Sequence, residues 1–265
     1  MSEDIRNKGL WEQIKSNREF TKCHDFMTIM KDSDQSKELP QPPLNIPPRN
    51  EIIRISADFS KGISNDSYTK LLDIRRSERV YDKTKPMTQA QLAFLLWSSF
   101  GIQGIKGENY ATLRPAPSGG ARHAFELYFI VRNVEGLKPG IYHYLPLENI
   151  GSKDVSIEYL GEFPNPDERI VEMTSNQKWT ANTQVVLFLS CVAYRAEWRY
   201  STQSHRVMLI DAGHIGQNMM LTAAAIGMGS CCIAAYDQAK CDETLGLDGF
   251  EEYTVYACAV GTPKN

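Results

Sequence analysis

Three arginines and a serine lie within five residues near position 75. The segment LLDIRRSERVYD, residues 71–82, places Arg75, Arg76, Ser77 and Arg79 directly after a short apolar helical pattern, and neighbouring carboxylates offset these charges only in part. Like charges this close repel one another, so the cluster is either a solvated surface turn or a site for a strong anion. Planar guanidinium groups bind oxyanions through paired N–H donors. The segment alone leaves both interpretations open.

Other sequence motifs for phosphate, metal or nucleophile chemistry are absent. The glycine pattern GMGSCC at residues 227–232 follows a helix and precedes a strand, which is the wrong order for a dinucleotide-binding fingerprint. The sequence has no Walker A loop and no G-x-S-x-G elbow. Its six cysteines show no C-x-x-C spacing, so we expect no metal site. Asp211 and His214 share one helix face without a serine context, which indicates that they cap or orient neighbouring elements.

Length and composition describe a globular chain. Its 265 residues are 42% hydrophobic, enough for one substantial core or at most two small ones. A net charge of −3 and a pI of about 6 provide no basic field that would attract nucleic acid. No stretch approaches the roughly 20 apolar residues that span a bilayer, and the N-terminus lacks a signal-peptide pattern. We therefore expect a cytoplasmic protein without nucleic-acid or membrane partners.

Residues 1–50 differ in composition from the rest of the chain. Five prolines stand between Pro40 and Pro48, which predicts an extended strap with little core of its own. Before the strap, residues 10–20 form a short amphipathic stretch that can pack on the main body. We interpret residues 1–50 as an N-terminal arm and residues 51–265 as one domain.

Helical and strand patterns alternate through the main body. A helix is predicted to begin at Thr88, a good N-cap residue. The apolar run 183–193 is typical of a central strand buried on both faces. A long helix over residues 204–226, ended by Gly227 and Gly229, has small residues on several faces, which fits either a subunit interface or a tightly packed monomer core. Further strands are predicted over residues 125–134, 141–145, 155–160, 230–236 and 253–261. This alternation predicts a layered α/β or α+β domain with a covered sheet.

Six segments, taken in order, resemble the nitroreductase superfamily. They are RRSERVYD, QLAFLLWSSFGI, RPAPSGGARHAFELYFIV, PGIYHYLP, DAGHIGQNMMLTAAAIGMGSCCIAAYD and YACAVGTP. The resemblance covers about residues 52–263 and points to the SagB-type dehydrogenase branch, which includes the azoline-to-azole oxidases of peptide tailoring. It implies an α+β sandwich in which helices flank a central mixed sheet, and an intertwined homodimer that binds FMN at its interface.

The resemblance gives the arginine cluster a chemical role. In the family an R-x-S-x-R element contacts FMN, which implies FMN contacts for Arg75, Ser77 and Arg79, with Arg76 beside them. The FMN phosphate carries close to two negative charges, which suits guanidinium groups. Reduced flavin is anionic along its N1–O2 edge, so we assign Arg79 to that edge and Arg75 to the phosphate or ribityl side. The resemblance therefore favours the anion site over the surface turn.

A glycine-rich loop matches a second FMN-contacting position of the family. In relatives this loop typically reaches the flavin of the other subunit. A serine hydroxyl and two glycines let polar groups and backbone amides approach a ring or a phosphate. The residues implied in this contact are Pro117, Ser118, Gly119 and Gly120.

The end of a predicted strand matches a third position. Ala234 and Ala235 stand where the family places a backbone N–H opposite flavin N5, and where some nitroreductases carry Glu-Gly. The backbone donor is retained, but a side-chain contribution is not. Many relatives also extend further at the C-terminus with cations for the phosphate, and Lys264 is the candidate for that role in this chain.

One departure bears on the reaction. Azole-forming relatives typically carry Lys-Tyr where this chain has Arg199 and Tyr200. Lysine can lose its proton and act as a base, whereas arginine stays charged, which counts against azoline dehydrogenation. Tyr200 can still exchange a proton near a substrate. The alternative for both residues is a polar interface pair. The aromatic residues Trp97, Tyr110 and Trp198 either line an open slot over the ring or belong to the core.

The resemblance implies an FMN-dependent oxidoreductase of nitroreductase type. Such an enzyme passes two electrons from NAD(P)H through FMN N5 to a small conjugated or nitroaromatic acceptor. Its expected partners are NAD(P)H, a small-molecule acceptor and a second copy of the chain. Two alternatives stay open: a SagB-type azoline-to-azole dehydrogenase acting on a modified peptide, and a flavin-binding protein without turnover.

Overall fold

Strand β6, Val185–Val192, lies inside a six-stranded sheet with the order β5-β4-β3-β6-β8-β7. Its side chains alternate between two apolar layers, as the period of a strand requires. Leu187 and Leu189 pack into one hydrophobic cluster, and Val186 and Phe188 pack into the other. Both faces of β6 are therefore covered, which confirms the prediction made from its nearly continuous apolar run.

The computed structural model describes residues 8–22, 28, 31, 37–38, 66–108, 110–162 and 164–264. The other strands of the large sheet are β3 (Phe125–Val131), β4 (Gly140–Tyr144), β5 (Ile157–Gly161), β7 (Gly229–Ile233) and β8 (Glu252–Gly261), and β1 (Gly104–Lys106) pairs with β2 (Ala111–Leu113) in a separate hairpin. The helices are α1 (Lys8–Thr21), α3 (Asp66–Ile74), α4 (Gln89–Phe100), α5 (Pro166–Met173), α6 (Tyr194–Tyr200), α7 (Ser204–Ala225) and α8 (Gln238–Leu245). Short 3-10 helices cover Gly119–Ala121, Pro146–Asn149, Lys178–Asn182 and Ser201–Gln203.

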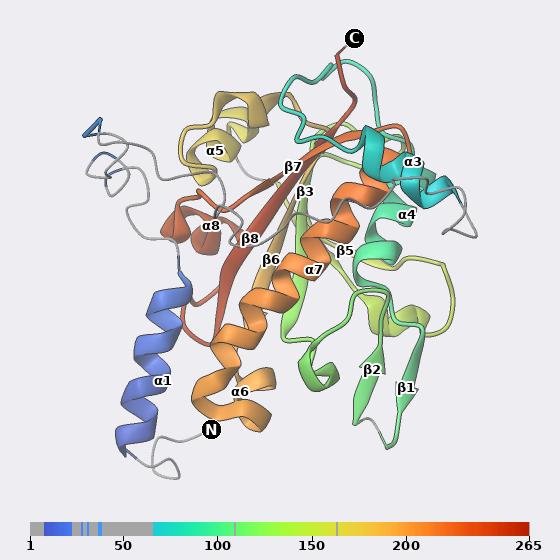
Figure 1. Ribbon diagram of the computed structural model, residues 1–265. Helices are drawn as coiled ribbons and strands as arrows, with labels where there is room; N and C mark the ends of the chain where they lie inside the picture. The colour runs from blue at the N-terminus through green and yellow to red at the C-terminus, as the bar shows by residue number, and fades with distance from the viewer. Residues whose placement is uncertain are drawn as a thin grey trace, which may run out of the picture.

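Helices cover both faces of the sheet, so the domain has three layers (Figure 1). Helices α4 and α7 supply the apolar cluster on one face, while α5 and α8 supply the cluster on the other. Helix α4 begins with a capping box in which Thr88 and Gln91 satisfy each other's backbone N–H groups. Helix α7 ends where Gly227 takes a left-handed conformation with φ of 74°. Within the described residues, no helix has both the length and the apolar content needed to cross a membrane.

The predicted mixed sheet needs one correction. Every pairing between neighbouring strands of the large sheet is antiparallel. Helix α7 crosses over the sheet between β6 and β7, so these two strands run in the same direction, as a crossover connection requires. Strand β8 then inserts between them and pairs antiparallel with both. Within the described residues, parallel pairing is confined to isolated bridges, one of which joins Ser77 to Ser230.

Helix α1 of the predicted arm packs on the main body. Trp11 and Ile14 are buried, and the ring of Trp11 meets that of Phe250 edge-on at 6.0 Å between centroids. This packing confirms the prediction for the amphipathic stretch. The proline-rich strap at residues 40–48 lies outside the described residues, and the division of the chain at residue 50 stays a prediction.

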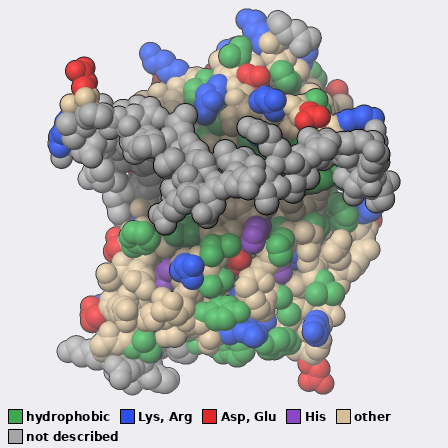
Figure 2. Space-filling model, in the orientation of Figure 1, with side chains coloured by type: hydrophobic (Ala, Val, Ile, Leu, Met, Phe, Trp, Pro, Cys, Tyr) green, Lys and Arg blue, Asp and Glu red, His purple; other side chains and the backbone are tan. Residues whose placement is uncertain are grey.

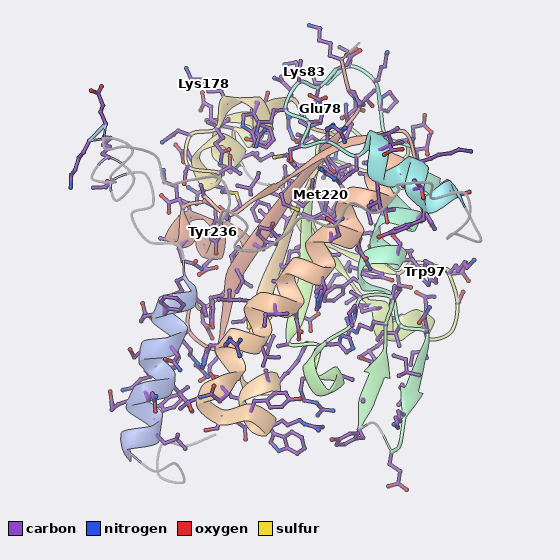
Figure 3. The ribbon with its side chains drawn as sticks, viewed as in Figure 1. Glu78, Lys83, Trp97, Lys178, Met220 and Tyr236 are labelled. Atoms are coloured by element: carbon purple, nitrogen blue, oxygen red, sulfur yellow. The ribbon has the colours of Figure 1, made fainter. Side chains whose placement is uncertain are left out.

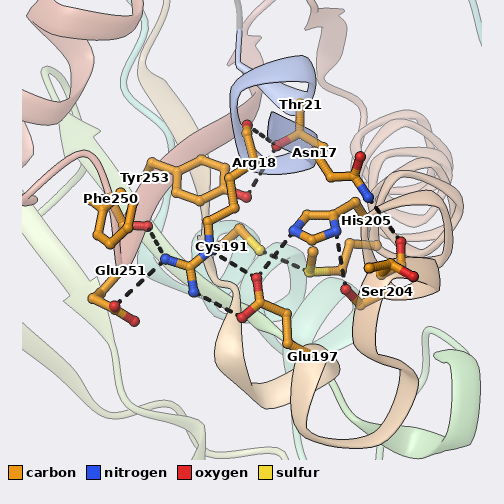
Figure 4. A network of polar contacts seen from close by, with 12 residues as sticks. Asn17, Arg18, Thr21, Cys191, Glu197, Ser204, His205, Phe250, Glu251 and Tyr253 are labelled. Carbon is orange, nitrogen blue, oxygen red and sulfur yellow. Dashed lines mark hydrogen bonds and ion pairs between the residues drawn. The ribbon is translucent and has the colours of Figure 1, made fainter. Parts of the chain in front are cut away.

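Arg18 connects α1 to the body through a buried polar network (Figure 4). Its Nε and Nη2 each lie 2.8 Å from a carboxylate oxygen of Glu197 on α6, and its Nη1 donates to the Phe250 carbonyl over 3.0 Å. His205 Nε2 on α7 lies 3.1 Å from the same carboxylate. Burial favours the neutral carboxyl, but the hydrogen bonds and charges of Arg18 and His205 outweigh it and lower the pKa of Glu197 to about 2. The network therefore holds the arm helix, α6 and α7 together.

Candidate active site

The arginine cluster forms an extended segment along the outer edge of β7. Helix α3 ends at Ile74, and the chain then runs beside the sheet, where Ser77 bridges Ser230 and the N–H of Glu78 donates to the Ser230 carbonyl over 2.9 Å. Glu78 lies at the upper end of the molecule, above Met220 of α7 (Figure 3). We call residues 75–79 the cationic loop. Its backbone is fixed by the sheet edge, which leaves the side chains to project from it.

Among the described residues, the charges of the cationic loop have no carboxylate partners. Arg75 is half-buried, Arg76 and Arg79 are exposed, and none of the three forms an ion pair with a carboxylate of the described residues. Glu78 does not neutralise them, because its Oε1 accepts from the backbone N–H groups of Arg79 and Val80. Figure 2 shows Lys and Arg side chains gathered over this end of the molecule, with acidic side chains between them. The loop is therefore a concentrated positive site that an anion would stabilise.

A hollow of about 220 Å³ opens behind the cationic loop. Met220 of α7 and Gly229 of β7 contribute to its wall. At Gly229 the strand lies very close to the cationic loop, because a Cβ added to this glycine would stand 2.7 Å from Glu78 Cγ. The N–H of Lys264 donates to the Val80 carbonyl over 3.0 Å, so the predicted C-terminal cation lies directly after the loop's far end. The loop, the hollow and Lys264 thus occupy one region.

The predicted contact at the end of β7 lies beyond the sheet ladder. The last pair between β7 and β8 joins Ile233 to Ala257, and Ala234 and Ala235 follow it. Ala234 is exposed, and the carbonyl of Ala235 accepts from Gln177 Nε2 over 2.9 Å. Because a strand rises about 3.3 Å per residue, these alanines lie roughly 13 Å along the chain from Ser230. An elongated ligand lying along β7 would therefore meet the cationic loop at one end and Ala234 at the other.

The glycine-rich loop is held at the other end of α7 by Asp211. The Gly119 N–H donates to both carboxylate oxygens of Asp211, over 3.1 and 3.2 Å, and the Ser118 hydroxyl also bonds to this carboxylate. Burial raises the pKa of Asp211 above its ordinary value. The sequence predicted that Asp211 orients a neighbouring element, and this loop is that element. Its role in the site could not be inferred, because Asp211 and Gly119 are 92 positions apart.

Gly120 brings the glycine-rich loop against the pair Arg199 and Tyr200. It has a left-handed φ of 56°, and a Cβ placed on it would lie 2.4 Å from the Tyr200 hydroxyl and 2.9 Å from Arg199 Nε. No side chain fits there, so glycine is required by both space and conformation. Arg199 Nη1 also donates to the Tyr110 hydroxyl. The structure thus joins two predicted site segments that the sequence separates by about 80 residues.

The aromatic candidates divide into two groups. Tyr110 and Trp198 both stack with the guanidinium of Arg122, at 4.6 and 5.4 Å from the ring centroids, and so lie near the glycine-rich loop. Trp97 instead donates from Nε1 to the Ser152 carbonyl over 3.0 Å and stacks with Phe94. Tyr110 and Trp198 thus lie beside the glycine-rich loop, whereas Trp97 contacts Ser152 and Phe94, and the slot over the ring stays a prediction.

The predicted site residues form two groups, which we call half-sites. The cationic half-site comprises residues 75–79, Ala234, Ala235 and Lys264, and the loop half-site comprises residues 117–120, Arg199 and Tyr200. Asp211 supports the loop half-site, whereas Met220 lines the hollow of the cationic half-site. Nine helix positions place these two residues on opposite faces of α7, about 14 Å apart along its axis. Within one chain the two half-sites therefore lie on different sides of α7.

The sequence model of the nitroreductase family matches residues 72–262, which include both half-sites apart from Lys264. The chain belongs to the nitroreductase family. A Methanocaldococcus jannaschii protein named as a nitroreductase is 27% identical over 195 residues, 72% of this chain and 90% of that protein. The membership confirms the resemblance inferred from the six sequence segments, and an oxidoreductase activity is consistent with it.

Two further relatives are named as processing proteins. The trifolitoxin-processing protein TfxB of Rhizobium leguminosarum is 30% identical over 166 residues, 59% of this chain and 42% of TfxB. The microcin B17-processing protein McbC of Escherichia coli is 27% identical over 143 residues, 51% of this chain and 49% of McbC. The chain thus spans less than half the length of these two relatives. These two matches support the assignment of the chain to the SagB-like branch of the family.

Solved structures agree on the fold. A chain of the E. coli microcin synthetase McbBCD complex, with truncated pro-MccB17 bound, superposes with a TM-score of 0.72 at 18% identity, covering 99% of this chain and 96% of that one. The NADPH:FMN oxidoreductase of Vibrio harveyi, solved with NAD+, gives a TM-score of 0.51 at 14% identity over 75% of this chain and 69% of its own. These likenesses establish the nitroreductase fold for this protein.

Proposed function

We propose that the protein is an FMN-dependent oxidoreductase that works as a homodimer. The observation that carries the proposal is the cationic loop: three guanidiniums lie together on the edge of β7 without a carboxylate partner among the described residues. In a member of the nitroreductase family, such a cluster fits the FMN phosphate. When bound, FMN supplies two-electron chemistry at N5, taking electrons from NAD(P)H and passing them to an acceptor.

The residues of this chain would hold and tune the cofactor. Arg75 would bind the phosphate or ribityl side, with Arg76 and Lys264 adding positive charge nearby, and Arg79 would offer a fixed cation to the anionic edge of the ring. Ala234 and Ala235 would present a backbone N–H rather than a side chain. Tyr200 could donate or accept a proton at a substrate, whereas Arg199 cannot act as a base because it stays charged.

A second copy of the chain would complete the site. The two half-sites lie on opposite faces of α7, so we expect a flavin on the cationic half-site of one chain to contact the loop half-site of its partner. Helix α7 also leaves Leu209 and Ile210 exposed, at 39% and 50%, next to Gly213. A helix face of this kind suits close packing against another copy. The division of the site and this exposed helix face support the proposed homodimer.

The proposed acceptor is a small conjugated or nitroaromatic molecule. The loop half-site is open to such a molecule beside Tyr110 and Trp198, of which 49% and 58% are exposed. The V. harveyi relative by fold is named as an NADPH:FMN oxidoreductase, which supports NAD(P)H as the electron donor. Arg199 stands where azole-forming relatives typically carry lysine, which also favours this reaction over one that needs a lysine base.

A second candidate function is the oxidation of azolines in a modified peptide. It is favoured by the peptide-processing relatives TfxB and McbC, and by the fold match to the McbBCD complex that extends over nearly the whole chain. In that case Tyr200 would have to exchange the proton without a neighbouring base. The substrate would reduce the flavin, so no reaction with NAD(P)H would be needed.

Absorbance spectroscopy of the purified protein tests the proposal. We expect flavin bands at about one FMN per subunit that bleach on anaerobic addition of NADH or NADPH, and a dimer mass by light scattering. Bound flavin that bleaches only with an azoline peptide would favour the second candidate. Bound flavin that no donor reduces would identify a flavin-binding protein without turnover. Protein that is colourless and refuses added FMN would contradict the assignment of the cationic loop.

A further inference from the structure

A cavity of about 670 Å³ lies beside the loop half-site. The β1–β2 hairpin, strands β3 and β4 and the short helix Pro146–Asn149 form its walls. None of the residues predicted to contact FMN lines it, but Ala121 and Arg122 do, and they follow Gly120 directly. Its volume lies within the range of sites for small molecules, about 300–1,000 Å³. The cavity thus has the size of a substrate pocket and shares a wall segment with the loop half-site.

Arg114 is a half-buried cation in the wall of this cavity. Its Nε donates to Thr112 Oγ1 over 3.1 Å, and its guanidinium stacks 4.6 Å from the centroid of the Phe100 ring. Among the described residues, it has no carboxylate within ion-pair distance, and its Nη2 has no hydrogen-bond partner. Burial lowers the pKa of Arg114 to about 10, so it remains charged at neutral pH. An anion reaching Nη2 would offset the cost of burying this charge.

Among the described residues, no carboxylate of the cavity forms an ion pair with Arg114, although the charge of Glu126 partly stabilises it. Glu126 accepts from Arg195 and lies 3.1 Å from His143 Nε2, and Glu148 is exposed. Burial, together with the charge of Arg114, lowers the pKa of His123 to about 4, so this wall histidine is neutral at pH 7. Three arginines therefore face two glutamates around the cavity, one of which is already paired.

The rest of the wall is mainly apolar. It includes Ile105, Ala111, Leu145, Pro146 and Leu147. Such a wall suits a hydrocarbon or aromatic body, whereas a phosphate or another compact anion would leave most of it without contacts. The ligand that fits both features has an anionic end and an apolar body.

We propose that the substrate of this oxidoreductase is an organic carboxylate with an apolar body, whose carboxylate binds Arg114 in this cavity. The inference rests on the proposed function, and it narrows the acceptor to one chemical class. Arg114 acts as a specificity residue that binds the part of the substrate not undergoing reaction. The reacting end would then lie toward Gly120, Arg199 and Tyr200, because Ala121 and Arg122 connect the cavity to them.

A matched pair of acceptors tests the proposal in the flavin-loaded protein. Titration calorimetry with 4-nitrobenzoate and 4-nitrobenzamide compares an acid with a neutral molecule of nearly the same shape. We expect the acid to bind at least tenfold more tightly, and its KM to be lower by a similar factor. Arg114→Met should remove this preference by weakening the acid about tenfold, with the amide and kcat little changed. Arg169→Met, which removes an arginine paired with Glu243 far along the chain, should keep the preference.

Several outcomes would overturn the proposal. These are equal binding of acid and amide, binding of neither, or a preference that survives Arg114→Met in folded protein. If Arg114→Met does not fold, the acid–amide comparison in the unaltered protein still decides, and Arg114→Lys serves as the second variant. A peptide ending in a free phenylalanine carboxylate, compared with its C-terminal amide, shows whether a peptide can supply the anion. Selective acid binding by protein whose flavin never bleaches would instead refute the proposed function alone.

Discussion

Two clusters that contain arginine are built in opposite ways in this chain. Arg18 is fully buried, makes a two-point ion pair with Glu197 and stacks between Trp11 and Phe250. The cationic loop has three arginines on the edge of β7, and none of them has a carboxylate partner among the described residues. The first cluster satisfies its charges within the fold. The second keeps its charges available for a ligand.

The contrast separates residues that maintain the structure from residues that bind. When a buried ion pair loses one partner, the other charge stays uncompensated in the protein interior. Such a substitution therefore destabilises the whole fold. An exposed arginine without a partner contributes little to stability, so its loss is felt only when a ligand is present. The following predictions are arranged from the largest expected effect to the smallest.

The largest effect is expected from Arg18→Met. This change removes the cation but leaves the Glu197 carboxylate buried, which should lower the free energy of unfolding by about 3–5 kcal/mol. Urea denaturation measures the difference. Lys15→Met on the same helix is the control, because Lys15 pairs with an exposed Glu12 and should change stability by less than about 0.5 kcal/mol. A loss below about 1 kcal/mol for Arg18→Met would contradict the structural role of the pair.

The same network should make stability depend on acid pH. The pKa of Glu197 is about 2 in the folded protein and close to 4.5 in the unfolded chain, so its charge stabilises the fold above about pH 4.5. This contribution, at most about 3 kcal/mol, is lost as the pH falls from 4.5 toward 2. Unfolding free energies measured between pH 6 and 2 should therefore fall more steeply for the unaltered protein than for Glu197→Gln. Parallel curves would show that another group titrates.

Changes in the cationic loop should weaken FMN binding and leave the stability of the fold nearly unchanged. Arg75→Gln or Arg79→Gln should each weaken FMN binding by roughly 10- to 100-fold, because each removes one charge-assisted contact worth about 1.5–3 kcal/mol. The free energy of unfolding without FMN should change by no more than about 0.5 kcal/mol. Fluorescence titration measures the affinity for FMN, and urea denaturation measures the free energy of unfolding. A variant that lost stability but kept its affinity for FMN would show that the loop arginines maintain the structure rather than bind the cofactor.

The smallest effect is expected at Lys264. Its ammonium already acts on Asp82, whose pKa is lowered mainly by hydrogen bonds from Thr84 and in part by the charge of Lys264. Lys264→Gln should therefore weaken FMN binding by less than about threefold. Lys138→Gln, which breaks an exposed pair with Glu162, is the control and should leave the affinity unchanged. A tenfold loss of FMN affinity in Lys264→Gln would show that Lys264 contributes as much to binding as a loop arginine.

Local sequence patterns predicted most of the elements and their layers. The apolar run of β6 and the Thr88 cap are properties of short segments, and the structure confirms both. The strand order could not be predicted in the same way. Strand β8 separates β6 from β7, and this depends on pairing between strands about 70 residues apart along the chain. Propensity and periodicity contain no information about such pairing.

The candidate site was predictable to a similar extent. Residue types identified the cationic loop and the glycine-rich loop, and the family resemblance gave them roles. The contact between Gly120 and Tyr200 and the support from Asp211 became visible only in three dimensions. The pair of Arg18 with Glu197 joins residues 179 positions apart, and no local pattern indicates it. Long-range polar partners are set by the fold, so a single sequence rarely reveals them.

The cationic loop also affects how the protein behaves when it is concentrated. Strand β7 is the outer strand of the sheet, and an outer strand offers open hydrogen-bonding groups to any other strand that meets it. Ser77 and Glu78 occupy this edge at Ser230, and the arginines around them repel a second edge of the same charge. The loop therefore protects the sheet from aggregation as well as offering charge to a ligand. Replacing the arginines with glutamine would keep Ser77 and Glu78 on the edge but remove the charge repulsion, whereas apolar replacements would also expose apolar surface there and favour aggregation.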